Sequence, residues 1–334
     1  MRYTAVIIEK IMNSNSSHNL ENNELRVEAS ADGQRIDNYL FTKLKHLPKN
    51  QIYRLLRTGQ VRVNKGRKKP TYRLIEGDIV RLPPAALPAD EDKSSKIKVP
   101  PGLVKKIKQA ILYEDKGLII LNKPSGLAVH GGSGLSFGVI ELLRTIYPNA
   151  PYLELVHRLD RDTSGCLMIA KKPSVLKQLH EALRSDGVEK CYYALLAGKW
   201  RRKAQLVNAP LKKNVLKSGE RVVRVDNSGK PSLTEFSLVE QFPGACLVKA
   251  FPKTGRTHQI RVHAAHMELP ILGDDKYGNE EVDKLFKRLG LKRLFLHAAS
   301  LKFVMPNTNK VFSISAPLEP SLEQLLNNLR ESNE

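Results

Sequence analysis

Residues 157–165 read His-Arg-Leu-Asp-Arg-Asp-Thr-Ser-Gly, between two apolar stretches at 153–156 and 166–170. Apolar runs of this length predict buried strands, so 157–165 is predicted as a loop between buried elements, where catalytic groups are commonly displayed. Its two carboxylates and two guanidinium groups fall within five residues. They are costly to bury unless they pair with one another. Spacing alone leaves two interpretations, an exposed ion-pair loop that ends in a Gly turn or a loop that carries chemistry.

The chain has 334 residues, enough for about two domains of ~150 residues. Its 55 Lys and Arg against 34 Asp and Glu give a net charge of +21, and 41% of its residues are hydrophobic. That apolar content supports a core, and the clustered positive charge predicts a polyanionic partner such as nucleic acid. The alternative is that the excess Lys and Arg only keep the protein in solution.

Sequence features argue against membrane and secreted classes. No run reaches the ~20 apolar residues of a membrane span, and the apolar stretch 5–8 is shorter than the ~7 residues of a signal-peptide core. The three cysteines, Cys166, Cys191 and Cys246, are few and far apart, so they predict neither disulfides nor a zinc knuckle. We therefore expect a cytoplasmic protein.

Composition divides the chain into four parts. Residues 1–24 are polar and are predicted to be a disordered extension. Residues 25–83 form a small basic domain, in which 26–82 carry 14 Lys and Arg against 5 Asp and Glu. Residues 84–103 are rich in Pro and charge and predict an extended linker. Residues 104–330 form one larger domain.

In the small domain, Ile36, Leu40 and Leu44 recur every fourth residue, as on one face of a helix. A second helix is expected to begin at Pro48 and to end at Gly59. Two short strands, 61–63 and 79–82, are expected to follow it, each next to a turn.

The larger domain is predicted to be α+β with a mixed, mostly antiparallel sheet, because its strand and helix candidates do not alternate as regular βαβ units. The strand candidates are 118–121, 167–170, 192–197, 247–251 and 294–303, and the helix candidates are 136–147, 174–185 and 257–267.

Two further segments concentrate polar donors. Residues 122–130 read NKPSGLAVH after a predicted strand, and residues 254–264 read TGRTHQIRVHA at a predicted helix start. Helix N-termini with Arg nearby suit phosphate binding. The alternative for 254–264 is a basic amphipathic helix with a solvated face.

Together these motifs resemble the pseudouridine synthases of the RluA type. HRLDRDTSG at 157–165 is similar to the catalytic signature of that family, and 122–130, 190–195 (KCYYAL), 254–264 and 294–298 are similar to its other motifs. Residues 25–83 resemble the S4 RNA-binding domain. The resemblance implies the pseudouridine synthase fold, and it is strongest to the subgroup that modifies several uridines of 23S ribosomal RNA.

The resemblance also implies a role for each matching residue. Asp160 would be the catalytic carboxylate, as a nucleophile or as a base near the sugar. Arg261 would pair with Asp160 through its planar fork. Tyr192 would pack on the target base, where an aromatic face replaces the stacking that a flipped nucleotide loses, and its hydroxyl could also move a proton. Arg158 would hold the RNA where the uridine leaves it.

The implied partner is 23S ribosomal RNA, and we expect a monomer that needs no cofactor and no metal. Seven basic residues of the small domain would contact phosphates, although each could instead face solvent freely. They are Arg54, Arg57, Arg62, Lys65, Arg67, Lys68 and Lys69.

The sequence lacks the motifs that other classes of enzyme would need. His258, His263 and His266 suggest zinc, but neither HExxH nor a cysteine pair is present. The sequence also lacks a P-loop, a GxGxxG motif and a deaminase signature. Asp160 and Asp162 form a DxD pair, but no nucleotide-sugar fold pattern accompanies it. The remaining alternative is a non-catalytic RNA-binding or ribosome-assembly protein, which would have no reason to keep Asp160, Tyr192 and Arg261 together.

Overall fold

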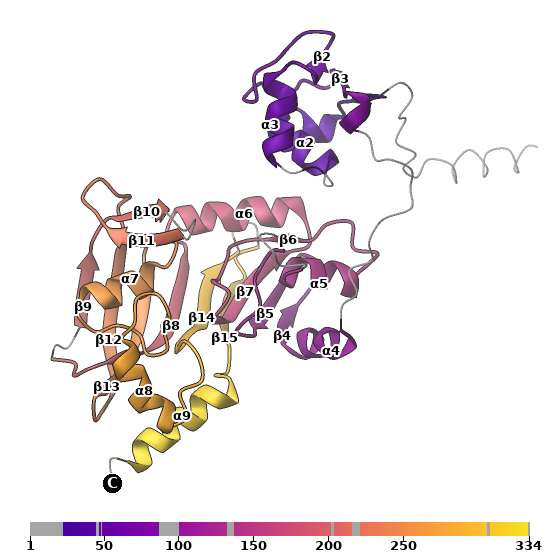
Figure 1. Ribbon diagram of the computed structural model, residues 1–334. Coiled ribbons are helices and arrows are strands. Elements are labelled where there is room, and N and C mark those ends of the chain that lie inside the picture. Colours follow the sequence, from indigo (N-terminus) through magenta and orange to yellow (C-terminus); the bar gives the residue numbers. More distant parts are fainter. Residues whose placement is uncertain are drawn as a thin grey trace, which may run out of the picture. The chain divides into compact units, whose positions relative to one another are not determined.

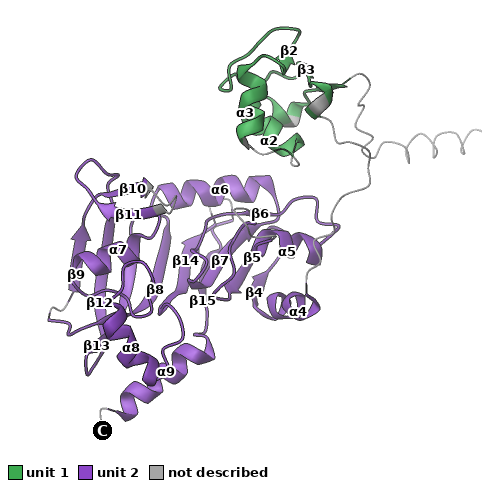
Figure 2. Ribbon diagram, viewed as in Figure 1, with its two compact units in different colours: residues 1–96 green, residues 97–334 purple. Residues whose placement is uncertain are grey.

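The protein is described here from a computed structural model, in which residues 23–44, 47, 49–86, 100–131, 137–201, 204–215, 221–305 and 308–332 are described. The chain forms two compact units, residues 1–96 and 97–334 (Figure 2). Most of the predicted disordered extension, 1–24, lies outside the described residues. Its last two residues are part of the smaller unit, because Glu24 belongs to a strand and the carbonyl of Asn23 accepts the Leu82 backbone N–H at 2.7 Å.

The smaller unit packs two helices, α2 (Ile36–Lys43) and α3 (Lys49–Arg57), with an antiparallel sheet in the order β1 (Glu24–Arg26), β3 (Ile79–Arg81), β2 (Arg62–Val63) (Figure 1). The helix face predicted from Ile36, Leu40 and Leu44 is confirmed, because all three side chains are buried. Gly59 lies just beyond α3 at φ +73°, a left-handed conformation that suits the end of a helix.

Both ends of the predicted linker, 84–103, differ from the extended chain that its prolines predict. Residues Pro84–Ala86 form a 3-10 turn, η3, in which Ala86 is fully buried. Helix α4 (Pro101–Gln109) begins with Pro101 in its first turn. Proline is tolerated at that position because the N–H it lacks would have no partner there. The middle of the predicted linker, 87–99, lies outside the described residues.

The larger unit is built on one sheet. Among its described residues ten strands pair, eight of them in the order β4-β5-β7-β14-β8-β13-β12-β9, with β15 on β14 and β6 on β7 (Figure 1). Their bounds are β4 (Ile111–Glu114), β5 (Leu118–Lys123), β6 (Glu154–Leu155), β7 (Ser164–Ala170), β8 (Val188–Ala197), β9 (Ala204–Asn208), β12 (Leu233–Phe242), β13 (Ala245–Pro252), β14 (Leu296–Val304) and β15 (Val311–Ser315).

Five further helices and a hairpin complete the described part of this unit. They are α5 (Val139–Ile146), α6 (Pro173–Arg184), α7 (Gln259–His266), α8 (Glu280–Arg288), α9 (Pro320–Glu331) and the antiparallel pair β10 (Leu211–Val215) and β11 (Arg221–Val225). All five predicted strands and all three predicted helices are confirmed within a few residues. None of the helices among the described residues is long and apolar enough to cross a bilayer.

The predicted α+β class with a mostly antiparallel sheet is confirmed. Of the strand pairs in the described residues, one is parallel, the short contact of β7 with β14 at Ser164–His297 and Gly165–Ala298. Gly165 has φ +107°, and a Cβ built there would lie 2.2 Å from the carbonyl oxygen of Ala298. Only glycine can therefore bring the end of the 157–165 loop this close to β14.

The sheet carries two apolar cores. One lies around β5, β7, α5 and α6, and the other lies around β8, β13, α7 and α9. Tyr192 on β8 contacts both clusters, so the strand lies at the junction between them. The loop 157–163 and the start of α7 therefore face each other across this junction.

Candidate active site

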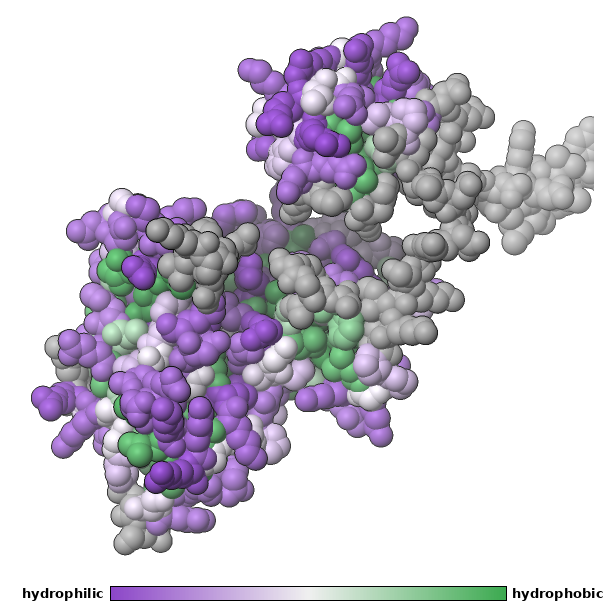
Figure 3. Space-filling model, viewed as in Figure 1, coloured by the Kyte–Doolittle hydropathy of each residue, from purple (hydrophilic) through white to green (hydrophobic). Residues whose placement is uncertain are grey.

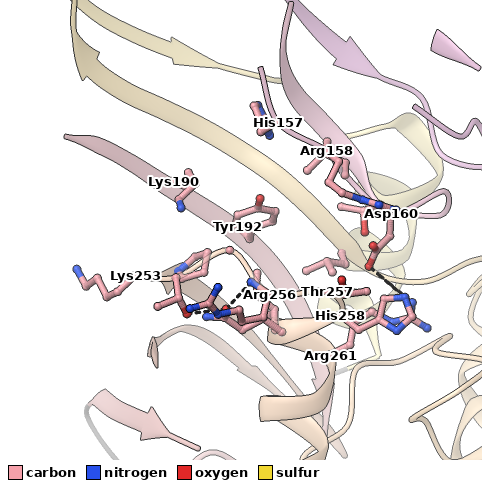
Figure 4. A pocket seen from close by; sticks show the side chains of 18 of the residues that line it. His157, Arg158, Asp160, Lys190, Tyr192, Lys253, Arg256, Thr257, His258 and Arg261 are labelled. Carbon is pink, nitrogen blue, oxygen red and sulfur yellow. Dashed lines mark hydrogen bonds and ion pairs between the residues drawn. The ribbon is translucent and has the colours of Figure 1, made fainter. Parts of the chain in front are cut away.

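A pocket of about 370 Å³ lies at the junction of the two cores. Most of its lining comes from three segments, namely the loop 157–163, part of β8 and the segment 252–261 that leads into α7 (Figure 4). Leu183 of α6 and Leu296 of β14 complete the lining. The pocket therefore unites four of the motifs that the sequence analysis singled out, namely 157–165, 190–195, 254–264 and 294–298. The motif at 122–130 lies behind it and supports the loop.

A buried lysine, Lys123, anchors the backbone of the loop 157–163. The Lys123 side chain, at the end of β5, is fully buried and donates to the carbonyls of Pro124, Leu127 and Arg161 at 2.8, 2.8 and 2.9 Å. Burial lowers the pKa of Lys123 to about 7, and the nearby Asp162 carboxylate opposes that shift. Because Arg161 directly follows Asp160, this lysine fixes the backbone next to the central carboxylate.

Two more side chains hold the loop at its far end. Ser125 Oγ donates to the carbonyl of Asp162 at 2.8 Å, and Arg293 Nη2 donates to Ser164 Oγ at 2.8 Å. The Asp162 carboxylate pairs with the neighbouring Arg161 at 3.1 Å. The loop is therefore tied to two distant parts of the chain, the segment 123–125 and Arg293.

Asp160 projects into the pocket with its side chain 19% exposed. One carboxylate oxygen, Oδ2, lies 3.8 Å from Arg261 Nη1 and 3.9 Å from His258 Nε2. Figure 4 shows the carboxylate facing these two side chains across the pocket. The sequence motifs thus converge on one carboxylate beside a fixed cation.

The predicted pairing of Arg261 with Asp160 is present as an ion pair at 3.8 Å, but the predicted two-point bond needs a correction. The two-point bond of the guanidinium goes to Asp274, from Nε at 2.7 Å and from Nη2 at 2.6 Å, while Asp160 lies opposite the remaining nitrogen. Nη2 also contacts Asp275 at 3.2 Å. Burial alone would lower the pKa of Arg261, but Asp274 and Asp160 raise it above its ordinary value, so the cation is permanent. Sequence reasoning missed Asp274, although its place in the polar run 274–277 could have marked it.

Tyr192 lies on β8 in the pocket wall. Burial, with a smaller contribution from the Asp160 charge, raises its pKa above the ordinary range. Its hydroxyl therefore stays protonated at neutral pH.

Arg158 is exposed at the pocket, where Lys190, Lys253 and Arg256 also lie (Figure 4). Arg256 Nε donates to the carbonyl of Pro231 at 3.1 Å. These four basic residues suit the phosphates on either side of a bound nucleotide.

The histidines considered as metal ligands have other partners. His263 is fully buried, and its ring nitrogens contact Thr234 Oγ1 at 2.8 Å and the Ala209 carbonyl at 3.0 Å. His258 contacts Tyr277 rather than another histidine. Among the described residues, no group of three or more His, Cys, Asp or Glu side chains is placed to hold a metal ion.

In the smaller unit, a groove of about 860 Å³ runs between α3 and residues 67–70. Five of the seven predicted RNA-binding residues line it, namely Arg54, Arg57, Arg67, Lys68 and Lys69. The other two, Arg62 and Lys65, are exposed outside this lining. The face of this unit seen in Figure 3 is mostly hydrophilic.

Comparisons with known proteins define the class. Residues 117–266 match the family model described as RNA pseudouridylate synthase, and residues 34–80 match the S4 domain. The solved structure of the human protein "RNA Pseudouridylate Synthase Domain Containing 4" is 28% identical with a TM-score of 0.57 and covers 69% of this chain and 96% of its own.

The chain belongs to the RNA pseudouridylate synthase family, whose reaction is an isomerisation. Within the family it is 55% identical to "Ribosomal large subunit pseudouridine synthase C" of Pasteurella multocida, over 92% of this chain and 94% of that one. The protein of the same name from Escherichia coli (strain K12) is 53% identical, over 92% and 96% of the two chains. The predicted family and the predicted S4 domain are both confirmed.

Proposed function

We propose that this enzyme converts specific uridines of 23S ribosomal RNA to pseudouridine, with Asp160 as the catalytic carboxylate. The main support for this proposal is the position of Asp160 in the pocket, with one carboxylate oxygen facing Arg261 and His258. The relatives named for the ribosomal large subunit, at 52–55% identity, support the substrate class.

The reaction rearranges uridine without adding or removing atoms. The C1′–N1 glycosidic bond breaks, the base rotates, and a new bond joins C1′ to C5. The C5 proton leaves and N1 ends protonated. An ionised carboxylate can assist by attacking the sugar or by removing a proton from it, and the position of Asp160 in the pocket supports either role.

The other residues take supporting roles in this proposal. Tyr192 stacks on the extruded base and offers a protonated hydroxyl. Arg158 holds the RNA where the uridine leaves it. The groove of the smaller unit contacts phosphates and supplies affinity, with Arg62 and Lys65 beside it. The enzyme acts in the cytoplasm as a monomer, with no metal or cofactor.

The test is chemical mapping of pseudouridine in 23S RNA from cells that lack the gene. Complementation with the wild-type gene should restore the modified sites, and Asp160→Asn should not, because the substitution keeps the size of the side chain and removes its charge. The purified Asp160→Asn protein should still bind RNA, since binding rests on many phosphate contacts. Restoration of the sites by Asp160→Asn would refute the catalytic assignment. A non-catalytic RNA-binding protein would leave the pattern of pseudouridine unchanged.

A further inference from the structure

His258 stands at the first turn of α7 and faces the Asp160 carboxylate. Its Nε2 lies 3.9 Å from Asp160 Oδ2, and its side chain is 15% exposed. On the opposite edge of the ring, Nδ1 lies 2.7 Å from the hydroxyl of Tyr277. The imidazole therefore bridges Tyr277 and the carboxylate.

The partners of Tyr277 determine which ring nitrogen carries the proton. The backbone N–H of Val223 donates to the Tyr277 oxygen at 3.0 Å. Burial raises the pKa of Tyr277, so its hydroxyl keeps a proton and can donate it to His258 Nδ1. With Nδ1 as an acceptor, a neutral imidazole carries its proton on Nε2, and this N–H points toward Asp160.

The surroundings keep His258 neutral. Burial lowers its pKa, and the Asp160 carboxylate, which would raise it, is opposed by the cations of Arg261 and Lys276; Asp274 contributes a smaller raising effect. The ring is thus a hydrogen-bond donor at neutral pH without a net charge.

The two donors, Arg261 and His258, face the same carboxylate oxygen of Asp160. Arg261 Nη1 and His258 Nε2 lie 3.8 and 3.9 Å from Oδ2, while Oδ1 has no partner among the described residues. Hydrogen bonds at catalytic centres are often long before substrate binds and tighten in the complex.

From this geometry we propose that His258 is a positioning residue, which holds Oδ2 of Asp160 through its Nε2–H and so leaves Oδ1 facing the uridine. The proposal rests on the proposed function, and it adds a second donor to the arginine. It assigns no proton transfer to His258, since the neutral ring only orients the carboxylate.

The test compares two amide variants in the full chain, His258→Gln and His258→Asn. The glutamine amide reaches about as far as Nε2 and can still donate to Asp160. The asparagine amide reaches only about as far as Nδ1, so it can contact Tyr277 but not Asp160. His258 has φ +53°, a left-handed conformation in which Asn is favoured, so the asparagine variant is the less strained of the two.

We expect His258→Gln to keep kcat within about threefold of wild type and His258→Asn to lose at least about tenfold, since a small misplacement of a catalytic group is costly. The KM and the Kd for RNA should not change in either variant. Equal kcat in wild type and both variants would overturn the proposal. An equal loss in both would overturn it too, because it would indicate packing rather than donation.

Tyr277→Phe is an independent test of the same proposal, because it removes the hydroxyl that contacts Nδ1 of His258. Its kcat should fall severalfold at unchanged RNA affinity, and an unchanged kcat would contradict the proposed tautomer. Asp160→Asn in the same assay distinguishes a failure of the proposed catalytic function from a failure of the positioning role of His258. If Asp160→Asn is active, the proposed function fails; if it is inactive while the His258 variants behave alike, only the positioning role fails.

Discussion

Arg261 donates two hydrogen bonds to Asp274, from Nε and Nη2, and its third nitrogen, Nη1, faces Asp160. Asp274 is 3% exposed, and its Oδ1 also accepts the backbone N–H groups of Lys276 and Tyr277 at 3.0 Å each. Asp274 therefore fixes both the arginine and the turn that carries Tyr277. The cation beside Asp160 is held by a different acid, so Asp160 is not locked in a two-point bond and stays free for the role proposed for it.

Asp274→Asn should be strongly destabilising, because it leaves a buried guanidinium without its charged partner. We expect a loss of on the order of 3–5 kcal/mol in the free energy of unfolding and a fall in kcat, measured by urea unfolding and by an isomerisation assay. Asp275→Asn is the matched control, since the Asp275 side chain is 67% exposed. Its cost should stay below about 1 kcal/mol. Similar losses in the two variants would contradict the anchoring role of Asp274.

His157 makes the stability of the larger unit depend on pH. Its Nε2 accepts the Met168 backbone N–H at 3.1 Å, and burial lowers its pKa to about 4 from the ordinary 6.5. The unfolded state therefore binds the proton first as pH falls, so stability is lost between pH 6.5 and 4, at up to about 1.4 kcal/mol per pH unit. His157→Gln, which retains an acceptor, should remove this part of the slope in urea unfolding. Exposed His266→Gln serves as the control, and an unchanged slope for His157→Gln would contradict the prediction.

The groove of the smaller unit should carry part of the RNA affinity. Replacing Arg54, Arg57 and Lys69 together with Ala should weaken binding and reduce the slope of log K against log salt by about 0.7–0.9 for each phosphate that is no longer neutralised. Arg26 and Arg81 are exposed on the sheet of the same unit, outside the groove lining, and their Ala variants are the control. Fluorescence titrations at several salt concentrations measure both quantities. If the control variants lowered the RNA affinity and the salt slope as much, RNA binding would depend on the total charge of the unit and not on the groove.

Gly165→Ala should disrupt the contact between β7 and β14. The new Cβ would lie 2.2 Å from the Ala298 carbonyl oxygen, at a backbone φ of +107°. Strain and overpacking together predict a loss of on the order of 3 kcal/mol in stability. Gly255→Ala is the control, since nothing lies within 4 Å of a Cβ there. Thermal melts of both variants measure the difference, and equal melting temperatures would refute the packing argument.

The strands and the loop that carries Asp160 could be predicted from the sequence because they have local signatures. Strand β7 and the 157–165 loop are recognisable from the change between apolar and charged residues. Helix α9 shows a similar local pattern, with Leu322, Leu325, Leu326 and Leu329 all buried, and it could have been predicted from that spacing.

The interactions that organise the site could not be read in the same way. The anchoring of the loop by Lys123 joins residues 38 positions apart, and no local pattern predicts that a lysine will be fully buried. The partner of Arg261 depends on which acid the turn after α7 brings near. Asp160 and Asp274 are equivalent in chemical type, so only the three-dimensional path of the chain distinguishes them.

Lys123, Ser125 and Arg293 hold the loop so firmly that Asp160 has little freedom to seek its substrate. Under the proposed function, the RNA therefore has to open locally and bring the uridine to the carboxylate. Under the proposed function, the ease with which the RNA deforms at each uridine becomes part of target selection.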